Sequence, residues 1–372
     1  MSGLTAVAMS GGLDSSVAAW LLARGGERVV GLSMLLWDQV EVVAHGRCCG
    51  ALDLGDARRV AAQVGIPHYT LRLTEEFREK VVDPFVAGYL DGRTPSPCVA
   101  CNTFVKFDLL LARARELGAT RLATGHYARI VEGPHGRELH AARAAAKDQS
   151  YFLFELGEEQ LAALAFPLGE LDKREVRELA RSAGLVVAEK GESMEVCFVA
   201  GSVREFVEQQ VARRPERFAA AADGRASELV DASGDRLGTG EPYYRFTVGQ
   251  RRGLGLAAGE RRYVLRVLPE ENRVVVGDGE ALAAPGLRGE RLHWIGASPP
   301  GEIEATVKIR SRHPGVAARV RPLAEGTAEV LFAEPQRGVA PGQAAVFYDG
   351  PRVLGGCWIV DRLDAVGRGR AA

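Results

Sequence analysis

Apolar stretches of strand length alternate with helix-like stretches through the first third of the chain. Residues 4–9 and 29–35 are short apolar runs, and residues 13–23 between them carry apolar side chains at helical spacing and end at Gly25-Gly26. The alternation continues with helical patterns over residues 57–64, 75–90 and 104–117 and with strand patterns over residues 68–73 and 121–123. Strands and helices that alternate at these lengths predict a parallel sheet covered on both faces, with ligands at the carboxyl ends of the strands.

The pattern changes twice further along the chain. Residues 158–211 are mostly helical in pattern, with capping-box sequences that begin at Asp172 and Ser202. Short β-branched runs between Gly-rich turns follow, and residues 263–268 and 273–276 predict a hairpin. Five further runs of strand length predict a small β-barrel, over residues 303–310, 317–321, 328–332, 344–348 and 353–360.

We therefore expect the α/β fold class and three domains. A parallel-sheet domain with a helical extension should occupy residues 1–200, and two small β-rich domains should follow over 201–285 and 286–363, the last a β-barrel. Residues 364–372 should form a tail. The length of 372 residues supports this division, because it exceeds what one ordinary core organises.

The composition is that of an ordinary folded protein. Hydrophobic residues make up 47% and charged residues 26%, which argues against disorder, collagen-like repeats and a coiled coil. The apolar runs stay well short of the roughly 20 residues that span a bilayer, and no basic segment followed by an apolar one opens the chain. We expect a cytoplasmic protein without a membrane partner.

The formal net charge of −1 hides an uneven distribution. Residues 1–200 hold 22 basic and 26 acidic side chains, a balance of −4, whereas residues 201–372 hold 25 and 22, a balance of +3. Within residues 243–266, six arginines stand against the single acid Glu260, with four aromatic residues among them. Such a local basic patch with interleaved aromatic residues favours contact with nucleic acid.

The string Ser10-Gly11-Gly12-Leu13-Asp14-Ser15-Ser16 directly follows a predicted strand and opens a predicted helix. Two glycines let the backbone turn tightly, successive N–H groups can surround an anion, and the helix dipole favours negative charge there. A bare Gly-Gly would be only a capped turn, but the whole string, so near the N-terminus, resembles the PP-loop of the ATP pyrophosphatases. It is not a Walker A loop, because no Gly-Lys-Ser/Thr follows.

This resemblance implies a site for ATP and Mg²⁺. Enzymes of this class use ATP to adenylate a carbonyl oxygen and release pyrophosphate. Asp14 would orient the phosphates or their magnesium ion, Met34 would lie near the adenine, and Gly125 would approach the nucleotide from a neighbouring strand end. The implied cofactor-binding residues are Ala8, Met9, Ser10, Gly11, Gly12, Leu13, Asp14, Ser15, Met34 and Gly125.

Six cysteines are too sparse for a disulfide scaffold in a chain of this length, so their grouping points to chemistry or metal binding. Cys98 and Cys101 form a C-x-x-C pair in a Pro-stiffened loop that leads into a helix, where thiolate character rises. Structural zinc would need a second pair, and Cys48-Cys49 has poor ligand spacing. Cys357 lies in an alternating strand pattern, and we expect it in the core.

Cys197 lies between Val196 and Phe198, and by itself such a cysteine is more often a buried strand residue. Its context changes that interpretation, because seven segments in one order resemble the bacterial tRNA-specific 2-thiouridylase family. The resemblance covers essentially the whole chain to about residue 363, through residues 10–16, 94–102, 123–129, 147–153, 166–169, 247–255 and 341–348.

The resemblance implies a three-domain enzyme that thiolates carbon 2 of the wobble uridine in tRNA. ATP would first activate O2 of the base as an adenylate. Cys197 would receive sulfur as a persulfide from a sulfur-relay protein or a cysteine desulfurase. Cys101 would then release the sulfur to the base and leave a Cys101–Cys197 disulfide.

The chain departs from the family pattern at Cys98, where many relatives have Asp. No carboxylate can then act as acid or base at this position. Cys98, Cys101 and Cys197 together supply three thiolates, which could hold a 4Fe-4S cluster with one open iron for the transferable sulfide. The sequence leaves both the persulfide and the cluster route open, and it assigns no role to Cys48 and Cys49.

The resemblance also implies where tRNA is bound. The implied contacts are His126, Lys147, Asp148, Gln149, Arg310, Ser311 and Gln343. Phosphate contacts are expected from the arginines of residues 245–266, with an affinity that falls as salt rises. We expect the target base to leave the stack, because its O2 must reach the adenylating phosphate.

Three other interpretations fit parts of the sequence. Another PP-loop adenylating enzyme, such as an amidotransferase or synthetase, would need a glutaminase partner or an amine site and would not use two distant thiols. A non-catalytic RNA-binding protein with a degenerate PP-loop would need neither the intact loop nor Cys101 and Cys197. A disulfide oxidoreductase that used Cys98 and Cys101 would leave the ATP loop without a role.

Overall fold

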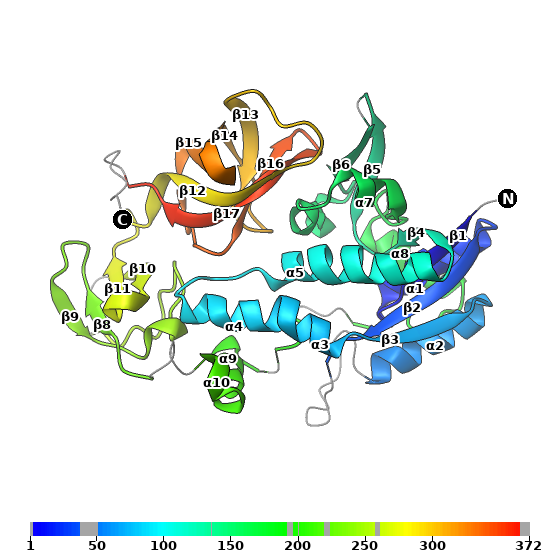
Figure 1. Cartoon of the computed structure of the whole chain (residues 1–372), viewed down its shortest axis with the longest axis horizontal. Helices are drawn as coiled ribbons and strands as arrows, with labels where there is room; N and C mark the ends of the chain where they lie inside the picture. Colours follow the sequence, from blue (N-terminus) through cyan, green and yellow to red (C-terminus); the bar gives the residue numbers. More distant parts are fainter. Residues whose placement is uncertain are drawn as a thin grey trace.

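The computed structural model describes residues 3–37, 51–134, 136–191, 196–199, 201–218, 224–256 and 261–364. Cys48, Cys49 and the tail beyond residue 364 lie outside the described residues. The described chain forms a parallel-sheet domain, a smaller β domain and a closed β-barrel, in that order (Figure 1), which confirms the expected fold class. No helix among these residues is long and apolar enough to cross a membrane.

A five-stranded parallel sheet organises the N-terminal domain. Its strands lie in the order β3-β2-β1-β4-β7, with bounds β1 Leu4–Ala8, β2 Arg28–Leu35, β3 His68–Arg72, β4 Ala119–Ala123 and β7 Leu164–Ala165. The chain starts at the centre of the sheet and builds first to one side and then to the other. The strand order therefore reverses beside β1, which is where open sheets of this kind bind ligands.

Successive residues of β1 point to opposite faces of the sheet. Val7 packs with α1 (Leu13–Arg24), α2 (Ala51–Val64) and α8 (Lys173–Ser182) on one face. Ala6 packs into the larger apolar cluster on the other face. Both faces are apolar, which explains why the central strands β1 and β2 are nearly continuous apolar runs in the sequence.

The two long helical patterns between β3 and β4 contain π-helical turns. The first consists of α3 (Thr74–Phe77), the π-helical η1 (Arg78–Val82) and α4 (Asp83–Leu90). The second consists of α5 (Pro97–Ala100), the π-helical η2 (Cys101–Leu110) and α6 (Leu111–Glu116), so it begins earlier than the predicted start at residue 104. Turns of this type are rare and are found frequently at functional sites.

A hairpin that the sequence pattern did not predict follows β4. Strands β5 (Ala128–Gly133) and β6 (Gly136–Ala141) pair antiparallel. Arg and Glu interrupt their apolar pattern, so the alternation of a half-buried strand is weak. Two 3₁₀ turns and two helices then complete the helical extension, namely η3 (Ala145–Lys147), η4 (Ser150–Leu153), α7 (Glu158–Ala163) and α8.

The middle domain is a small mixed sheet preceded by helices α9 (Val203–Arg213) and α10 (Pro215–Phe218). Its strands lie in the order β10-β11-β8-β9. The predicted hairpin is confirmed, because β10 (Tyr263–Leu268) and β11 (Arg273–Gly277) pair antiparallel. Strands β8 (Glu228–Val230) and β9 (Arg236–Thr239) complete the sheet.

Six strands close into the C-terminal barrel. Strand β12 (Ala283–Trp294) pairs with β17 (Arg352–Arg362) and so joins the two ends of the order β12-β15-β14-β13-β16-β17. All five predicted strands are present, as β17 and as β13 (Ile303–Lys308), β14 (Val316–Pro322), β15 (Ala328–Arg337) and β16 (Ala344–Asp349).

Strand β12 is the barrel strand that the sequence pattern missed, because glycines interrupt its apolar residues. Packing requires these glycines. A Cβ on Gly286 would lie 2.3 Å from the backbone oxygen of Val330, and one on Gly289 would lie 2.2 Å from Cys357 Sγ. Cys357 is fully buried, and burial raises the pKa of its thiol to about 12, which confirms its expected place in the core.

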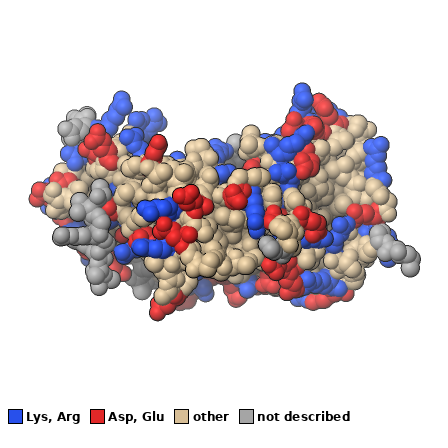
Figure 2. All heavy atoms as spheres, turned by 90° about the horizontal axis from the view of Figure 1, so that it is seen from above, with Lys and Arg blue, Asp and Glu red and all other residues tan. Residues whose placement is uncertain are grey.

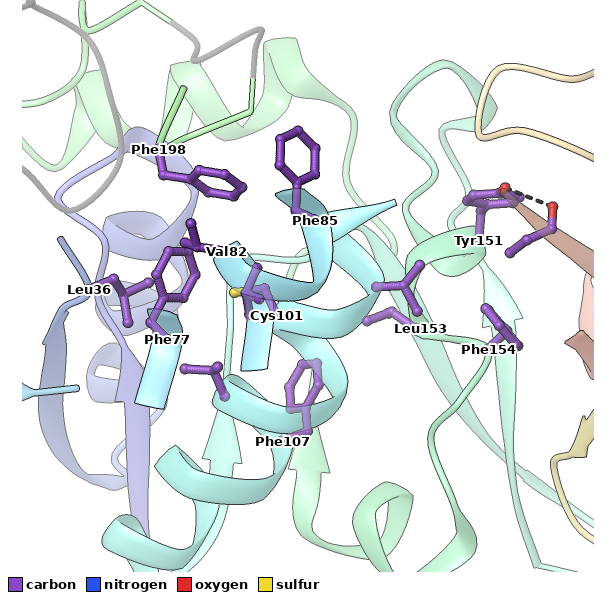
Figure 3. Close-up of a cluster of buried hydrophobic side chains, with 14 of the residues drawn as sticks. Leu36, Phe77, Val82, Phe85, Cys101, Phe107, Tyr151, Leu153, Phe154 and Phe198 are labelled. Carbon is purple, nitrogen blue, oxygen red and sulfur yellow. Dashed lines mark hydrogen bonds between the residues drawn. The ribbon is translucent and has the colours of Figure 1, made fainter. Parts of the chain in front are cut away.

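Buried polar contacts join the domains. Tyr151 Oη donates to the backbone oxygen of Ala344 in β16, shown as a dashed line in Figure 3. Tyr243 of the middle domain donates to the backbone oxygen of Leu90. The Asp83 side chain in α4 is 2% exposed and accepts from arginines 214 and 217, at the start of the middle domain. A charge this buried is stable only with its partners in place.

Replacement of Asp83 by alanine should therefore destabilise the protein by about 3–5 kcal/mol, because it removes the partner of the mostly buried Arg214. Thermal unfolding followed by circular dichroism measures the effect. The matched control is Glu79→Ala, an exposed carboxylate in η1 of the same helical stretch, which should change the stability by less than about 0.5 kcal/mol. Equal decreases in the unfolding temperature of the two variants would contradict a stabilising role for the buried ion pair.

Candidate active site

The loop from Ser10 to Ser16 turns tightly between β1 and α1. Gly11 has a φ of 75°, which glycine adopts without strain. A Cβ on Gly11 would lie 1.9 Å from the backbone oxygen of Asp53 in α2. Gly12 is the N-cap of α1 and has an ordinary φ of −90°. Position 11 thus requires glycine for two reasons, its backbone conformation and its contact with α2.

Serine hydroxyls hold the shape of this loop. Ser10 N donates to Ser15 Oγ at 3.1 Å, and the two hydroxyl oxygens are 3.2 Å apart. The Ser16 hydroxyl is fully buried and donates to Gly12 O at 2.9 Å, so it is part of the loop's own structure. Ser10 and Ser15 are therefore the hydroxyl residues that the loop presents to a ligand.

A cavity of about 330 Å³ opens at the carboxyl ends of β1, β2 and β4. The expected nucleotide-binding residues in its lining are Ala8, Met9, Ser10, Asp14, Ser15, Met34 and Gly125. Gly11, Gly12 and Leu13 belong to the same loop but are not in the lining. Gly125 packs on α1 so closely that a Cβ would lie 2.7 Å from Ser15 N, which explains the need for glycine there.

Three cysteines from two distant segments line the same cavity. Cys98 is exposed on α5, Cys101 is buried at the first position of η2, and Cys197 is partly buried. Phe198, next to Cys197, packs edge-on against Phe77 and Phe85, with ring centroids 5.5 and 5.2 Å apart (Figure 3). These aromatic contacts hold the Cys197 segment against α3 and α4, the helices that precede Cys101.

The carboxylate of Asp14 is engaged by two side chains from outside the loop. Lys173 Nζ lies 2.7 and 2.8 Å from its two oxygens, and Tyr127 Oη donates to Oδ1 at 2.8 Å. Lys173 is the first residue of α8, where the helix dipole disfavours a cation. Asp14 compensates that charge. The sequence signal for Lys173 is weak, a lysine directly after the N-cap residue Asp172.

A second lysine holds the other side of the loop. Lys190 Nζ donates to Gly11 O at 2.9 Å and to the carboxylates of Asp53 and Asp56 at 2.5 Å. Burial opposes the charge of Lys190, but the two carboxylates raise the pKa of Lys190 above its ordinary value. The loop is thus clamped between α2 and the segment after α8. No sequence signal points to Lys190.

Two of the expected tRNA-contact residues, His126 and Gln149, line the cavity. Gln149 Oε1 accepts from Tyr127 N at 2.9 Å, and His126 Nδ1 lies 2.7 Å from Thr124 Oγ1. Burial, with a smaller contribution from the charge of Lys106, holds the pKa of His126 well below its ordinary value. The imidazole is therefore neutral at neutral pH, and both residues offer uncharged hydrogen-bonding groups to the cavity.

The other expected tRNA contacts lie outside the cavity lining. The Asp148 carboxylate is 5% exposed and accepts from the backbone N–H groups of residues 142 and 150, so it shapes its own loop. Gln343 Nε2 donates to the backbone oxygen of residue 94, in the loop that leads to Cys98. Lys147 ends η3, and Arg310 and Ser311 follow β13 on the barrel.

The basic segment 243–266 is partly neutralised within the protein. Arg245 pairs with two glutamates and Arg266 with two aspartates. Arg251 and Arg252 are exposed. Figure 2 shows blue and red side chains interspersed over the face seen from above, so this face carries no field of a single sign. Any phosphate contacts from the segment would therefore come from a few arginines.

No group of three or more His, Cys, Asp or Glu side chains in the described part of the chain is arranged to hold a metal ion. Cys98, Cys101 and Cys197 have the ligand type that iron–sulfur clusters require. They share one cavity without forming such a ligand group. The residue type therefore fits a cluster, whereas the side chains are not gathered around a single metal ion.

Three family models match successive parts of the chain. The tRNA methyl transferase HUP domain matches residues 4–201, which is more than half of the chain. The tRNA methyl transferase PRC-barrel domain matches residues 206–278. The Aminomethyltransferase beta-barrel domain matches residues 285–359.

Curated relatives are similar over almost their full length. The tRNA-specific 2-thiouridylase MnmA of Geotalea uraniireducens is 50% identical over 361 residues, which are 95% of this chain and 94% of that protein. The tRNA-specific 2-thiouridylase MnmA of Geobacter metallireducens is 51% identical over 362 residues, 95% of either chain. Among solved structures, the chain is similar to a 4-thiouridine synthetase–RNA complex with bound ATP, at 19% sequence identity. The match covers 59% of this chain and 53% of that protein. Its TM-score of 0.32 is too low to support a conclusion.

Replacement of Gly11 by alanine should destabilise the protein by about 2 kcal/mol or more, because the new Cβ would overlap the backbone oxygen of Asp53 and the residue would keep a left-handed φ. Thermal unfolding measures the change. Gly12→Ala is the matched control, since its Cβ would meet Ser10 Oγ at an ordinary 3.4 Å, and it should lose much less stability. A Gly11→Ala protein as stable as the control would show that the loop can move away from α2.

Proposed function

The chain belongs to the tRNA-specific 2-thiouridylase family, and on this basis we propose that it replaces O2 of the wobble uridine in tRNA by sulfur, with ATP as the activating substrate. One observation carries the proposal, because Ser10 and Ser15 of the ATP loop and the thiols of Cys101 and Cys197 line one cavity. Activation of a base at O2 and delivery of sulfur to the adjacent C2 require both groups within reach of one bound base. A non-catalytic RNA-binding protein would need no such convergence.

Adenylation is the first step of the proposed reaction. The phosphates of ATP would lie at the loop from Ser10 to Ser16, where backbone N–H groups and the N-terminus of α1 favour negative charge. Met34, in the cavity lining, would lie beside the adenine. Uridine O2 would attack the α-phosphorus, the N3 proton would leave, and the bond to pyrophosphate would break. Mg²⁺ would supply neutralising charge to the phosphates, with Asp14 as the carboxylate in the lining.

Two thiols carry the sulfur step. The terminal sulfur of a Cys197 persulfide attacks C2, the C2–O2 bond breaks, and its electron pair leaves with AMP. The Cys101 thiolate then attacks the Cys197 sulfur, so the bond to the transferred sulfur breaks, a proton from solvent returns to N3, and 2-thiouridine is released beside a Cys101–Cys197 disulfide. A dithiol reductant restores both thiols before a persulfide-carrying protein, a sulfur relay or a cysteine desulfurase, reloads Cys197.

The substrate tRNA would present the wobble base outside its stack. His126 and Gln149 would contact the extruded base, because both line the cavity. The remaining RNA contacts would come from Lys147, Arg310, Ser311, Gln343 and the exposed Arg251 and Arg252, with Asp148 shaping the loop that follows Lys147. In this proposal residues 1–200 carry the chemistry, and residues 201–285 and 286–363 extend the RNA-binding surface.

The two-thiol route is favoured over a 4Fe-4S cluster. Among the described residues no three His, Cys, Asp or Glu side chains are gathered around a single metal ion, and the two-thiol route needs only Cys101 and Cys197. Cys98 also differs from Cys101 in environment, since one is exposed and the other buried. The sulfur step is therefore derived from thiols alone.

Wild-type protein given tRNA, ATP, Mg²⁺, a persulfide donor and a dithiol should form 2-thiouridine, read by mass spectrometry of the nucleosides. Cys101→Ser and Cys197→Ser should each lower the rate by about three orders of magnitude or more, because each removes a nucleophile. Asp14→Asn should also form 2-thiouridine more slowly, because it removes the carboxylate assigned to the phosphates and Mg²⁺. Cys357→Ala, in the barrel core, is the control and should keep its activity. Unchanged thiolation by Cys197→Ser would refute the proposed sulfur step.

Protein purified without oxygen should be colourless and active, and it should contain neither iron nor acid-labile sulfide. We would measure visible absorption and the iron and acid-labile sulfide contents of the purified protein. Stoichiometric iron and sulfide that disappear together in Cys98→Ser, along with the activity, would establish the cluster route instead.

A further inference from the structure

A lysine that the proposed reaction does not yet use lines the same cavity as the cysteines. Lys106 lies five residues after Cys101, within the π-helical η2. A π-helix closes its hydrogen bonds between residues i and i+5, so residues five apart share a face. In an α-helix the same two residues would diverge by about 140°. The wide turn thus brings Lys106 and Cys101 to one wall of the cavity.

A hydrogen-bond chain sets the position of Lys106. Its Nζ donates to Asn102 Oδ1 at 2.9 Å, and Asn102 Nδ2 donates to the backbone oxygen of Phe152 at 3.0 Å. Asn102 is 3% exposed and also lines the cavity. A buried amide therefore determines where the ammonium lies.

The charges of the cavity lining are divided between its two ends. Among the described residues, the lining contains one carboxylate, Asp14 in the ATP loop, and one lysine or arginine, Lys106 in the helix that contains Cys101. His126 adds no positive charge at neutral pH, because burial and the nearby Lys106 keep its pKa low. Lys106 is thus the positive charge that faces the thiol end of the cavity.

A series of contacts connects Lys106 with the nucleotide end. The ring centroid of Phe107, the next residue, lies 5.7 Å from that of His126. Gly125, directly before His126, packs against the first turn of α1 at Ser15. The wall formed by residues 124–126 therefore joins the ATP loop to η2, and Lys106 lies where this wall meets η2.

We propose that Lys106 binds the α-phosphate of the nucleotide and stabilises the negative charge that AMP gains as it leaves. This assignment rests on the proposed function, because it gives Lys106 a role in both the adenylation step and the sulfur step. The α-phosphate joins AMP, held at the ATP loop, to uridine O2, whose carbon must face Cys101 and Cys197. A phosphate in that place lies between the two ends of the cavity, within reach of a cation on η2.

The charge change in the second step explains what the ammonium does. When sulfur attacks C2, the C2–O2 bond breaks and its electron pair remains on O2, which departs as an oxygen of AMP. The phosphate changes from a monoanionic diester to a monoester dianion. A fixed ammonium stabilises the growing charge more in the transition state than in the adenylate, and so accelerates the step. No further proton, oxidant or reductant is involved.

The test uses AMP and adenosine as probes, because they differ by the phosphate alone. Calorimetry on the full chain should show that wild type prefers AMP. Lys106→Gln keeps a donor for Asn102 and loses the charge, so it should bind AMP about tenfold more weakly and adenosine as before. Its thiolation rate should fall about 100-fold. Lys106→Arg keeps the charge and should stay near wild type in AMP binding.

Lys80→Gln is the matched control. Lys80 lies in the other π-helical turn, η1, over the ring of Phe104, and it is not in the lining of this cavity. It should leave both affinities and the thiolation rate unchanged. If Lys106→Gln does not fold, Lys106→Met takes its place in the same comparison.

The assignment is overturned if wild type does not prefer AMP to adenosine, or if the uncharged variant keeps that preference. It is also overturned if Lys106→Gln weakens the binding of AMP and of adenosine equally, since the weaker binding would then not depend on the phosphate. A charge-dependent preference for AMP in a wild-type protein that forms no 2-thiouridine would refute the proposed function and leave the phosphate site in place.

Discussion

The contact between Gly11 and the backbone of α2 is the constraint on which the rest of the site depends. No side chain fits at this position, because a Cβ would lie 1.9 Å from the backbone oxygen of Asp53. Lys190 ties the Gly11 carbonyl to the same helix, because its ammonium also pairs with Asp53 and Asp56. With the loop fixed on α2, Ser10 and Ser15 line the cavity at the carboxyl ends of the strands. A displacement of Gly11 would move all of these groups together.

Paired charges surround this loop and prepare it for an anion. Lys173 pairs with Asp14 and Lys190 pairs with Asp53, and the two lysine side chains are only 17% and 23% exposed. Charges so far from water need fixed partners. A phosphate that enters the cavity therefore meets a carboxylate that is already compensated, and the repulsion between them is smaller. Lys106 adds a positive charge at the opposite end of the cavity.

Local patterns predicted the elements whose burial is either uniform, as in β1 and β2, or alternating, as in β11 and β14. The strands β1 and β2, the hairpin β10–β11 and five barrel strands follow apolar runs that need no knowledge of distant residues. The hairpin β5–β6 and strand β12 escaped prediction, because their polar residues and glycines are explained only by what packs against them. At Gly289, for example, the reason is the sulfur of Cys357.

The sequence by itself determined the fold class, the anion-binding loop and the cysteines that are candidates for sulfur chemistry, because these depend on residue type and local order. Cys197 lines one cavity with Cys101, as the family resemblance implied, but only the tertiary structure decided that Lys173 meets Asp14. Packing of whole elements sets such contacts, and local periodicity carries no record of them. The same holds for Lys106, because only the π-helical form of η2 turns it toward the face of Cys101.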